Sequence, residues 1–166
     1  MSAPPGEKGR GLLRIRRYEA RDHDAVWALH NLALEQVGAH AENGPWDEDL
    51  HRIEDAYLRD GGEFLVGVLG ERIVAMGAFQ WTGPDHAEIK RMRAHPEVQR
   101  QGFGRAILAE LERRASSAGY RTLQLDTTAG QVGAQHLYRH YGFQETGRTV
   151  RGAFETVLFE KRLREV

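Results

Sequence analysis

A glycine-containing segment at the start of a predicted helix, Gln99 to Arg105, constrains the fold and function of this chain most strongly. It follows a strand-like stretch, His86 to Ala94, and opens a helix predicted over Gly102 to Ser117. Gly102 and Gly104 carry no side chain, so a ligand can approach the backbone closely there. The first N–H groups of a helix have no internal partner and lie at the positive end of its dipole, which favours bound phosphate. The segment therefore predicts a strand–loop–helix unit that binds an anion.

Basic residues flank these glycines where the helix dipole disfavours them. Arg100 and Arg105 lie at the positive end of the predicted helix, and no acidic residue occurs from Val98 until Glu110. A bound phosphate would resolve this conflict. Two solvated arginines on a surface turn are the alternative, and the segment alone leaves both interpretations open.

The composition indicates one globular domain. The chain has 166 residues, of which 40% are hydrophobic, enough for a single core. We expect a flexible tail over residues 1–11 and one domain over residues 12–166. The net charge of −1 and the lack of a basic run argue against nucleic-acid and membrane partners, and no stretch is apolar for long enough to cross a bilayer. The tail lacks the apolar centre of a secretory signal, so a cytoplasmic location is expected.

Cysteine is absent from the chain, which excludes disulfides, thiolate zinc sites and a covalent cysteine intermediate. His136 and His140 are four residues apart on a predicted helix, but they lack the H-E-x-x-H arrangement and a third ligand. No metal is expected.

The order of predicted elements is β-α-α-β-β-β-α-β-α-β-β. Gly70-Glu71 fits a two-residue hairpin turn with glycine first. This order favours an α/β fold of the α+β type, a mixed sheet with helices on both faces, over a doubly wound sheet. Strands are predicted over residues 12–18, 64–69, 73–81, 86–94, 122–126, 144–150 and 154–162, and helices over residues 22–37, 47–58, 102–117 and 132–141.

A dinucleotide is one candidate for the phosphate ligand. Gly102-Phe103-Gly104 resembles the start of G-x-G-x-x-G, and Asp126 ends the next strand where a ribose-binding acid is expected. Ile107, however, occupies the third glycine position, and residues 95–98 make the loop before the glycines too long. These departures rank a dinucleotide-binding protein third among the functions considered.

Two spaced motifs resemble the GNAT superfamily of N-acetyltransferases. The family's pyrophosphate loop, Gln/Arg-x-x-Gly-x-Gly/Ala, is matched by Gln99, Gly102 and Gly104. A second block over residues 134–143, Ala-x-x-Leu-Tyr-x-x-x-Gly-Phe, resembles the family's other signature. The resemblance covers residues 12–163 and is specific over residues 88–143. It implies a mixed, mostly antiparallel sheet of about seven strands with about four flanking helices, and it implies coenzyme A as the ligand.

The resemblance assigns residues to acetyl-CoA, the implied co-substrate. The backbone at Met92 and Ala94 should pair with the pantetheine arm like an added strand, and the N–H groups of residues 100–105 should hold the pyrophosphate. Gln131 is the nearest match to an asparagine that often contacts coenzyme A in the family. The strand ends Arg93-Ala94 where the family commonly has Tyr-Val. The implied cofactor-binding residues are Met92, Ala94, Gln99, Arg100, Gln101, Gly102, Phe103, Gly104, Arg105, Gln131 and Tyr138.

Two side chains are candidates for proton transfer. By resemblance, Tyr138 is the tyrosine near the thioester sulfur and the predicted general acid, although its helical pattern alone suggests a core aromatic. Glu88 is the predicted general base, acting through water, and strand alternation would place it on the same face as Met92 and Ala94. Because members of the family vary in their base, Glu48 and Asp49 stay open as alternatives.

An acidic cluster around Trp46 joins the first two predicted helices, in the segment that commonly lines the acceptor site of the family. An acidic rim would suit a cationic amine. Acids are also favourable at a helix start without any ligand, so both interpretations stay open. The cluster consists of Glu42, Asp47, Glu48, Asp49, Glu54 and Asp55.

These observations predict an acetyl-CoA-dependent N-acetyltransferase. It would move an acetyl group to a primary amine of a small molecule, peptide or protein by direct transfer in a ternary complex. The alternative is a non-catalytic acyl-CoA-binding or regulatory module on the same fold, for which Tyr138 and Glu88 would be dispensable. Members of the family often dimerise, so a homodimer is left open.

Overall fold

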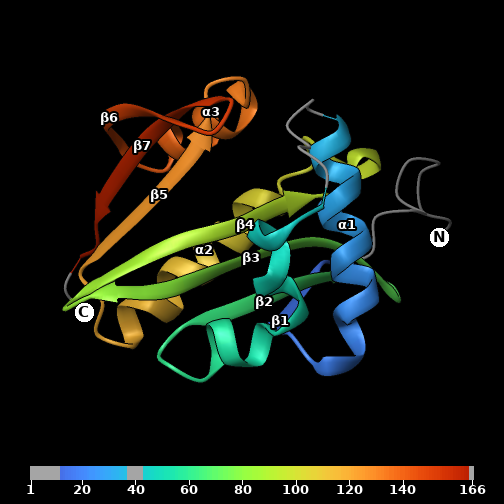
Figure 1. The fold of residues 1–166 in the computed structure, drawn as a ribbon. Helices are drawn as coiled ribbons and strands as arrows, with labels where there is room; N and C mark the ends of the chain where they lie inside the picture. Colours follow the sequence, from blue (N-terminus) through green and yellow to red (C-terminus); the bar gives the residue numbers. More distant parts are fainter. Residues whose placement is uncertain (1–11, 37–42, 165–166) are drawn as a thin grey trace, which may run out of the picture.

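The computed structural model describes residues 12–36 and 43–164, which form a seven-stranded sheet in the order β1-β2-β3-β4-β5-β7-β6 (Figure 1). Neighbouring strands are antiparallel except for β4 and β5, which are parallel. The strands are β1 (Arg14–Arg17), β2 (Glu63–Leu69), β3 (Arg72–Gly83), β4 (His86–Ala94), β5 (Thr122–Thr128), β6 (Gln144–Arg151) and β7 (Phe154–Arg162). The helices are α1 (His23–Gln36), α2 (Phe103–Ser117) and α3 (Val132–His140).

Helices cover both faces of the sheet, as the element order predicts. Figure 1 shows α1 and α2 on opposite faces. On the α2 face, Ile107 and Leu111 are buried with Phe159 in one core cluster, which also includes Tyr138 of α3. On the α1 face, Val26 packs in a second cluster with residues of β2 and β3. The sheet is therefore buried between two apolar layers.

Glycines at the predicted turns have the backbone geometry that glycine favours. Leu69 pairs with Arg72, so Gly70 and Glu71 form a two-residue hairpin turn. Gly102 precedes α2 with a φ of 82°, and its carbonyl accepts the backbone hydrogen bond from Ala106. Glycine adopts a positive φ without steric cost, so the chain can turn at Gly70 and begin α2 directly after Gly102.

The predicted helix over residues 47–58 is wrong. A 3₁₀ segment, η2 (Pro45–His51), is followed by a single π turn, η3 (Glu54–Leu58). Arg52 between them has non-helical dihedrals, φ −147° and ψ 50°. Contacts from the rest of the protein draw two aspartates of η2 inward, and these contacts override local helix preference. The ends of other elements shift by a few residues, while the tail over residues 1–11 lies outside the described residues.

Candidate active site

The parallel strands β4 and β5 separate soon after they meet. They pair only at His86 with Thr122, Ala87 with Leu123 and Glu88 with Gln124. Both strands then continue, and Figure 1 shows them diverging in a V. Beyond Glu88, the edge of β4 that faces β5 pairs with no strand of the described residues. The fold thus exposes backbone N–H and C=O groups to the opening.

An extra residue in β4 lies beside this opening. Ala78 of β3 pairs with Lys90, whereas Met76, two residues earlier, pairs with Arg93, three residues further along β4. Arg91, inside this bulge, has a φ of 60°, a left-handed conformation that is uncommon outside glycine. Bulges of this kind bend a strand and change the direction of its side chains.

The bulge corrects one prediction about the site. Met92 packs in the core cluster on the α2 face, where its Sδ fills the space beside Gly77. Glu88 pairs with Gln80, whose amide donates to the Ala56 carbonyl of η3 on the other face. The prediction that Glu88 and Met92 share a face is therefore wrong, because the additional residue shifts the alternation by one position.

Two contiguous cavities occupy the opening between β4 and β5. The larger, called here the loop cavity, has a volume of about 920 Å³ and is bounded by the Gln99–Arg105 segment and the start of α3. The smaller, the strand cavity, has a volume of about 260 Å³ and is bounded by β4 and β5. Both are lined by Leu34, Met92, Arg93, Gln131, Ala134 and Tyr138.

Every predicted site residue lines at least one of these cavities. Glu88 lines the strand cavity, and Tyr138 and Met92 line both. The remaining predicted residues line the loop cavity, namely Ala94, Gln99, Arg100, Gln101, Gly102, Phe103, Gly104, Arg105 and Gln131. Sequence reasoning missed the charged residues of the strand cavity, Lys90, Arg91, Arg93 and Asp126.

The loop cavity is walled by the starts of two helices. The first backbone hydrogen bond of α2 runs from Ala106 to Gly102, which leaves the N–H groups of residues 103–105 without an intrahelical acceptor. Gly130, Gly133 and neighbouring residues at the start of α3 line the opposite side. Two positive helix ends on one cavity favour an anionic ligand.

The side chains around the loop cavity are partly engaged already. The guanidinium of Arg105 lies over the Tyr141 ring, 5.5 Å from its centroid. Gln131 Oε1 accepts hydrogen bonds from both Thr127 Oγ1 (2.9 Å) and Thr128 Oγ1 (3.0 Å). Gln131 thus organises the β5–α3 loop, and its Nε2, which has no partner among the described residues, stays available to a ligand.

Tyr138 is buried, with its ring held by aromatic neighbours. It packs edge-on against Phe143, at 5.8 Å between centroids, and lies 6.1 Å from Phe159. Its hydroxyl has no hydrogen-bond partner within residues 12–36 and 43–164. Burial raises the pKa of Tyr138 to about 12, with Arg93 acting in the opposite direction. The hydroxyl is therefore a protonated donor at neutral pH that lines both cavities.

Glu88 has the properties of a base. Burial raises the pKa of its carboxyl above the ordinary value, Lys90 and Arg151 oppose this shift, and Asp126 adds to it. No hydrogen bond or ion pair joins Glu88 to another residue of the described part of the chain. A half-buried carboxylate with a raised pKa, unpaired beside a cavity, is suited to accept a proton.

The alternative bases are placed differently. Asp49 is bound by Arg91 through two hydrogen bonds, of 2.6 and 3.0 Å, and also accepts one from the Tyr57 hydroxyl. Burial favours a raised pKa for Asp49, but these bonds outweigh it and hold the pKa below its usual range. Glu48 is exposed and lines neither cavity. Glu88 is the carboxylate that the geometry favours.

The acidic segment joins β4 instead of forming a rim on the cavities. Arg91 also donates to the Trp46 carbonyl at 2.7 Å, so one guanidinium fastens η2 to the bulge. Asp47 is buried and bonded to His30 at 2.9 Å. Glu54 and Asp55 are exposed, and none of the described acids of this segment lines either cavity. Glu42 lies outside the described residues.

His30 makes the stability of this region pH-dependent. Burial, followed by the charges of Arg93 and Arg91, lowers the pKa of His30 from 6.5 to about 4. Between these pH values the unfolded chain binds a proton that the native chain does not. We therefore expect stability to fall as the pH drops from 6.5 towards 4, by about 3 kcal/mol at the acid end.

Urea denaturation at a series of pH values from neutral to about 4 measures this effect. His30→Gln is the comparison, because a glutamine amide can still donate to Asp47 but does not titrate. We expect the free energy of unfolding of the variant to depend less steeply on pH across this window. Parallel curves for the two proteins would contradict the role given to His30.

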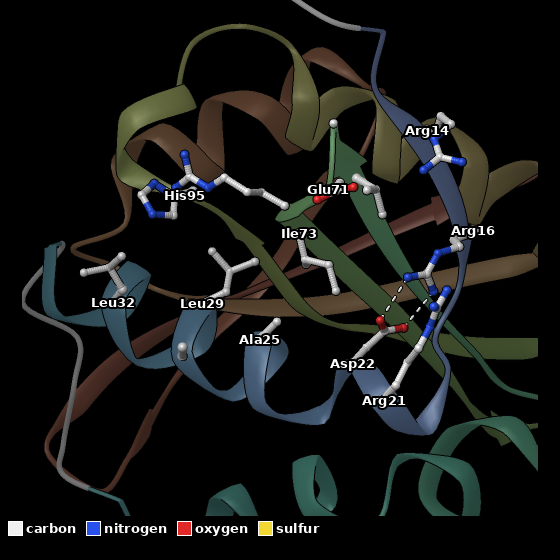
Figure 2. Close-up of a pocket in the computed structure, with 14 residues that line it drawn as sticks. Arg14, Arg16, Arg21, Asp22, Ala25, Leu29, Leu32, Glu71, Ile73 and His95 are labelled. Atoms are coloured by element: carbon white, nitrogen blue, oxygen red, sulfur yellow. Dashed lines mark hydrogen bonds and ion pairs between the residues drawn. The ribbon is translucent and has the colours of Figure 1, made fainter.

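A third cavity, of about 790 Å³, is bounded by β1, α1 and the turn between β2 and β3, and it shares no residue with the other two. Figure 2 shows Asp22 directed towards Arg16, and the two side chains form a paired contact of 2.7 and 2.9 Å. This pair joins β1 to the 3₁₀ turn, Ala20–Asp22, that precedes α1. None of the predicted site residues lines this cavity.

Within the described residues, no group of three or more His, Asp or Glu side chains is placed to hold a metal ion. His136 and His140 are both exposed on α3. None of the helices in residues 12–36 and 43–164 is long and apolar enough to cross a bilayer.

Residues 23–143 match the family model of the acetyltransferase (GNAT) family. The chain belongs to this family. The GNAT signature therefore accounts for the sheet, the opening between β4 and β5 and the glycine-containing loop together.

Solved GNAT-family structures share the whole fold. An acetyltransferase from Staphylococcus aureus Mu50 aligns with a TM-score of 0.84 at 17% identity, over 92% of this chain and 99% of that chain. The Salmonella typhimurium protein yncA, solved with its cofactor acetyl-CoA, aligns with a TM-score of 0.76 at 19% identity, over 93% of this chain and 95% of that chain. At such identities the likeness shows the fold alone.

Similarity in sequence extends to proteins named as acetyltransferases. Human N-acetyltransferase 8 is 31% identical over 119 residues, which are 63% of this chain and 52% of that protein. An IAA acetyltransferase from Azospirillum brasilense is 34% identical over 107 residues, 60% of this chain and 70% of that protein. The chain thus spans about half the length of the mammalian N-acetyltransferase 8 proteins that it matches.

Proposed function

We propose that this protein is an acetyl-CoA-dependent N-acetyltransferase that acts on a primary amine by direct transfer in a ternary complex. One observation carries the proposal. The unpaired edge of β4 beyond Glu88 leads from the strand cavity, which Glu88 lines, to the loop cavity, which the first residues of α2 line. Because the two cavities are contiguous, one extended ligand can bind with its phosphates in the loop cavity and its reacting end in the strand cavity.

The residues present fit coenzyme A. The N–H groups at the start of α2 suit the pyrophosphate, and the free edge of β4 at Met92 and Ala94 suits the pantetheine amides. The carbonyls of these two residues accept from Arg93 Nη1 (2.8 Å) and Gln99 Nε2 (3.4 Å). Each carbonyl has a second lone pair, so these contacts do not prevent pairing with an added strand.

When bound, acetyl-CoA supplies the thioester carbonyl carbon that the amine attacks. Glu88, with its raised pKa, accepts the proton of the acceptor amine, directly or through water. As the C–N bond forms and the thioester C–S bond breaks, the Tyr138 hydroxyl donates a proton to the leaving thiolate of coenzyme A. A backbone N–H beside the bulge, at Met92, is the candidate donor to the thioester oxygen.

The identity of the acceptor does not follow from family membership. A similar Escherichia coli protein is named for the alanine of ribosomal protein bS18, and a similar Xenopus tropicalis protein is named N-acetylaspartate synthetase. One name points to a protein and the other to a small molecule, so the acceptor must be inferred from the charges of this chain's own site.

Thermal melting with ligands tests the donor assignment. Acetyl-CoA at about 100 times its Kd should raise the Tm by about 5–10 °C, since a ligand that binds only the native state stabilises it. NAD and NADP at the same concentration should leave the Tm unchanged. A shift with NAD or NADP but not with acetyl-CoA would contradict the proposal.

Release of coenzyme A over a panel of amines and peptide N-termini tests the activity itself. We expect acceptor-dependent release above the rate of acetyl-CoA hydrolysis. A clear thermal shift with acetyl-CoA, combined with no acceptor-dependent release over the whole panel, would favour a non-catalytic acyl-CoA-binding module.

A further inference from the structure

Some charged side chains of the strand cavity are neutralised by neighbours. Arg91 is paired with Asp49, and Asp126 accepts a hydrogen bond from Arg151. Others form no ion pair with any residue in the described ranges, 12–36 and 43–164. These unpaired groups are Glu88, Lys90 and Arg93.

Arg93 is the most unusual of the unpaired groups. Among the described residues its Nε is buried without a hydrogen-bond partner, and its Nη1 donates only to the Met92 carbonyl at 2.8 Å. Burial and the nearby Arg91 lower the pKa of Arg93 to about 10, so the group is still a cation at neutral pH. A guanidinium whose Nε is buried without a partner is costly, and an anionic ligand would offset that cost. Lys90, on a flexible stem, reaches water more easily.

The geometry of a guanidinium indicates which anion fits. Its planar, forked donors match a carboxylate through two parallel hydrogen bonds. A doubly charged phosphate group would lie near Glu88 and Asp126 in the same cavity and would be repelled. The volume of about 260 Å³ accommodates a small molecule.

Glu88 and Arg93, two unpaired groups of opposite charge, line the strand cavity together with Tyr138. We propose that the acceptor is a small amino carboxylic acid, whose carboxylate pairs with Arg93 while its amine lies towards Glu88. This inference rests on the proposed acetyltransferase function and specifies the substrate class of the same site. Arg93 acts here as a specificity-determining residue, since it binds the part of the acceptor that does not react.

Matched acceptors test the proposal. The standard amino acids, their carboxamides and the corresponding amines without a carboxyl group are compared by coenzyme A release. For the best amino acid, we expect the wild-type kcat/KM to exceed that of its carboxamide on the order of 10²-fold, as for other buried charge pairs. Arg93→Met should abolish this preference, while the KM for acetyl-CoA stays within about two-fold of wild type. Arg93→Lys should restore part of the preference, because it retains the charge but not the fork.

Controls keep the interpretation specific. Arg113→Met removes an exposed positive charge on α2, where Arg113 is bonded to Glu110, and should keep the wild-type preference. Arg93→Met should melt at or above the wild-type Tm, because it removes an unpaired buried charge. Lys90→Met tests the other unpaired cation of the cavity. Loss of the preference in Lys90→Met but not in Arg93→Met would overturn the proposal.

Further outcomes separate this inference from the proposed function. Carboxamides turned over as fast as amino acids by the wild type would overturn the amino-acid proposal and leave acetyl transfer intact. In Arg93→Met, the KM for acetyl-CoA could rise by the same factor as the KM for the amino acid. That result would assign Arg93 to acetyl-CoA binding and would also overturn the amino-acid proposal. No release with any compound, despite an acetyl-CoA thermal shift, would contradict the acetyltransferase function and the inference together.

Discussion

Tyr138→Phe is expected to lower kcat by about 10²-fold or more, with the Tm and the KM for acetyl-CoA close to wild type. The substitution removes a hydroxyl that has no partner among the described residues and retains the ring that packs against Phe143 and Phe159. Steady-state coenzyme A release with a saturating acceptor measures the effect.

The raised pKa of Tyr138 adds a pH criterion. Because this pKa is about 12, the wild-type kcat should show no decline from ionisation of Tyr138 at moderately alkaline pH. Tyr141→Phe is the matched control. Tyr141 is the residue that follows α3, and it lines neither cavity, so its hydroxyl is removed without changing the site. An unchanged kcat in Tyr138→Phe would remove its role as general acid.

Glu88→Gln is expected to lower kcat by about 10²- to 10⁴-fold, the usual contribution of a general base. A base acts in its deprotonated form, so wild-type activity should fall as the pH drops through the raised pKa of Glu88. This acid limb should be absent from the residual activity of the variant. The pH profile of kcat at saturating acceptor measures both effects.

Two comparisons identify the limb as that of Glu88. Acceptors whose amines differ in pKa should leave the Glu88 limb where it is, whereas a limb from the amine itself should move with the acceptor. Glu48→Gln removes an exposed carboxylate that lines neither cavity and should behave as wild type. A large loss in Glu48→Gln with full activity in Glu88→Gln would transfer the role of base to Glu48.

The parts of the fold that local sequence determines were predictable. Gly102 and Gly119 mark the limits of α2 because both adopt a positive φ that other residues avoid, and the turn at Gly70 sets the β2–β3 register. The glycine-containing loop and the buried face of α2 follow from the same short-range patterns. These features need no knowledge of distant contacts.

The bulge and the charge pairing could not be predicted in the same way. Arg91 adopts a left-handed conformation that is not expected for an arginine from the sequence alone. The sequence feature that accompanies the bulge is a glycine on the neighbouring strand β3. A Cβ at Gly77 would lie 2.5 Å from Met92 Sδ. The sequence shows Arg93 only as a departure from the family's usual tyrosine. Whether an arginine finds a carboxylate depends on elements far away in the chain, as the contrast with Arg91 demonstrates.

The bulge also determines what kinds of genetic change β4 can accept. Arg91 secures η2, Met92 fills the core beside α2, and Arg93 enters the cavities, so three consecutive residues serve three separate layers. Loss of one residue here would do more than shorten the strand, since it would turn the following side chains to the opposite side of the sheet. We therefore expect homologous lineages to retain the length of this stretch even where its residues differ.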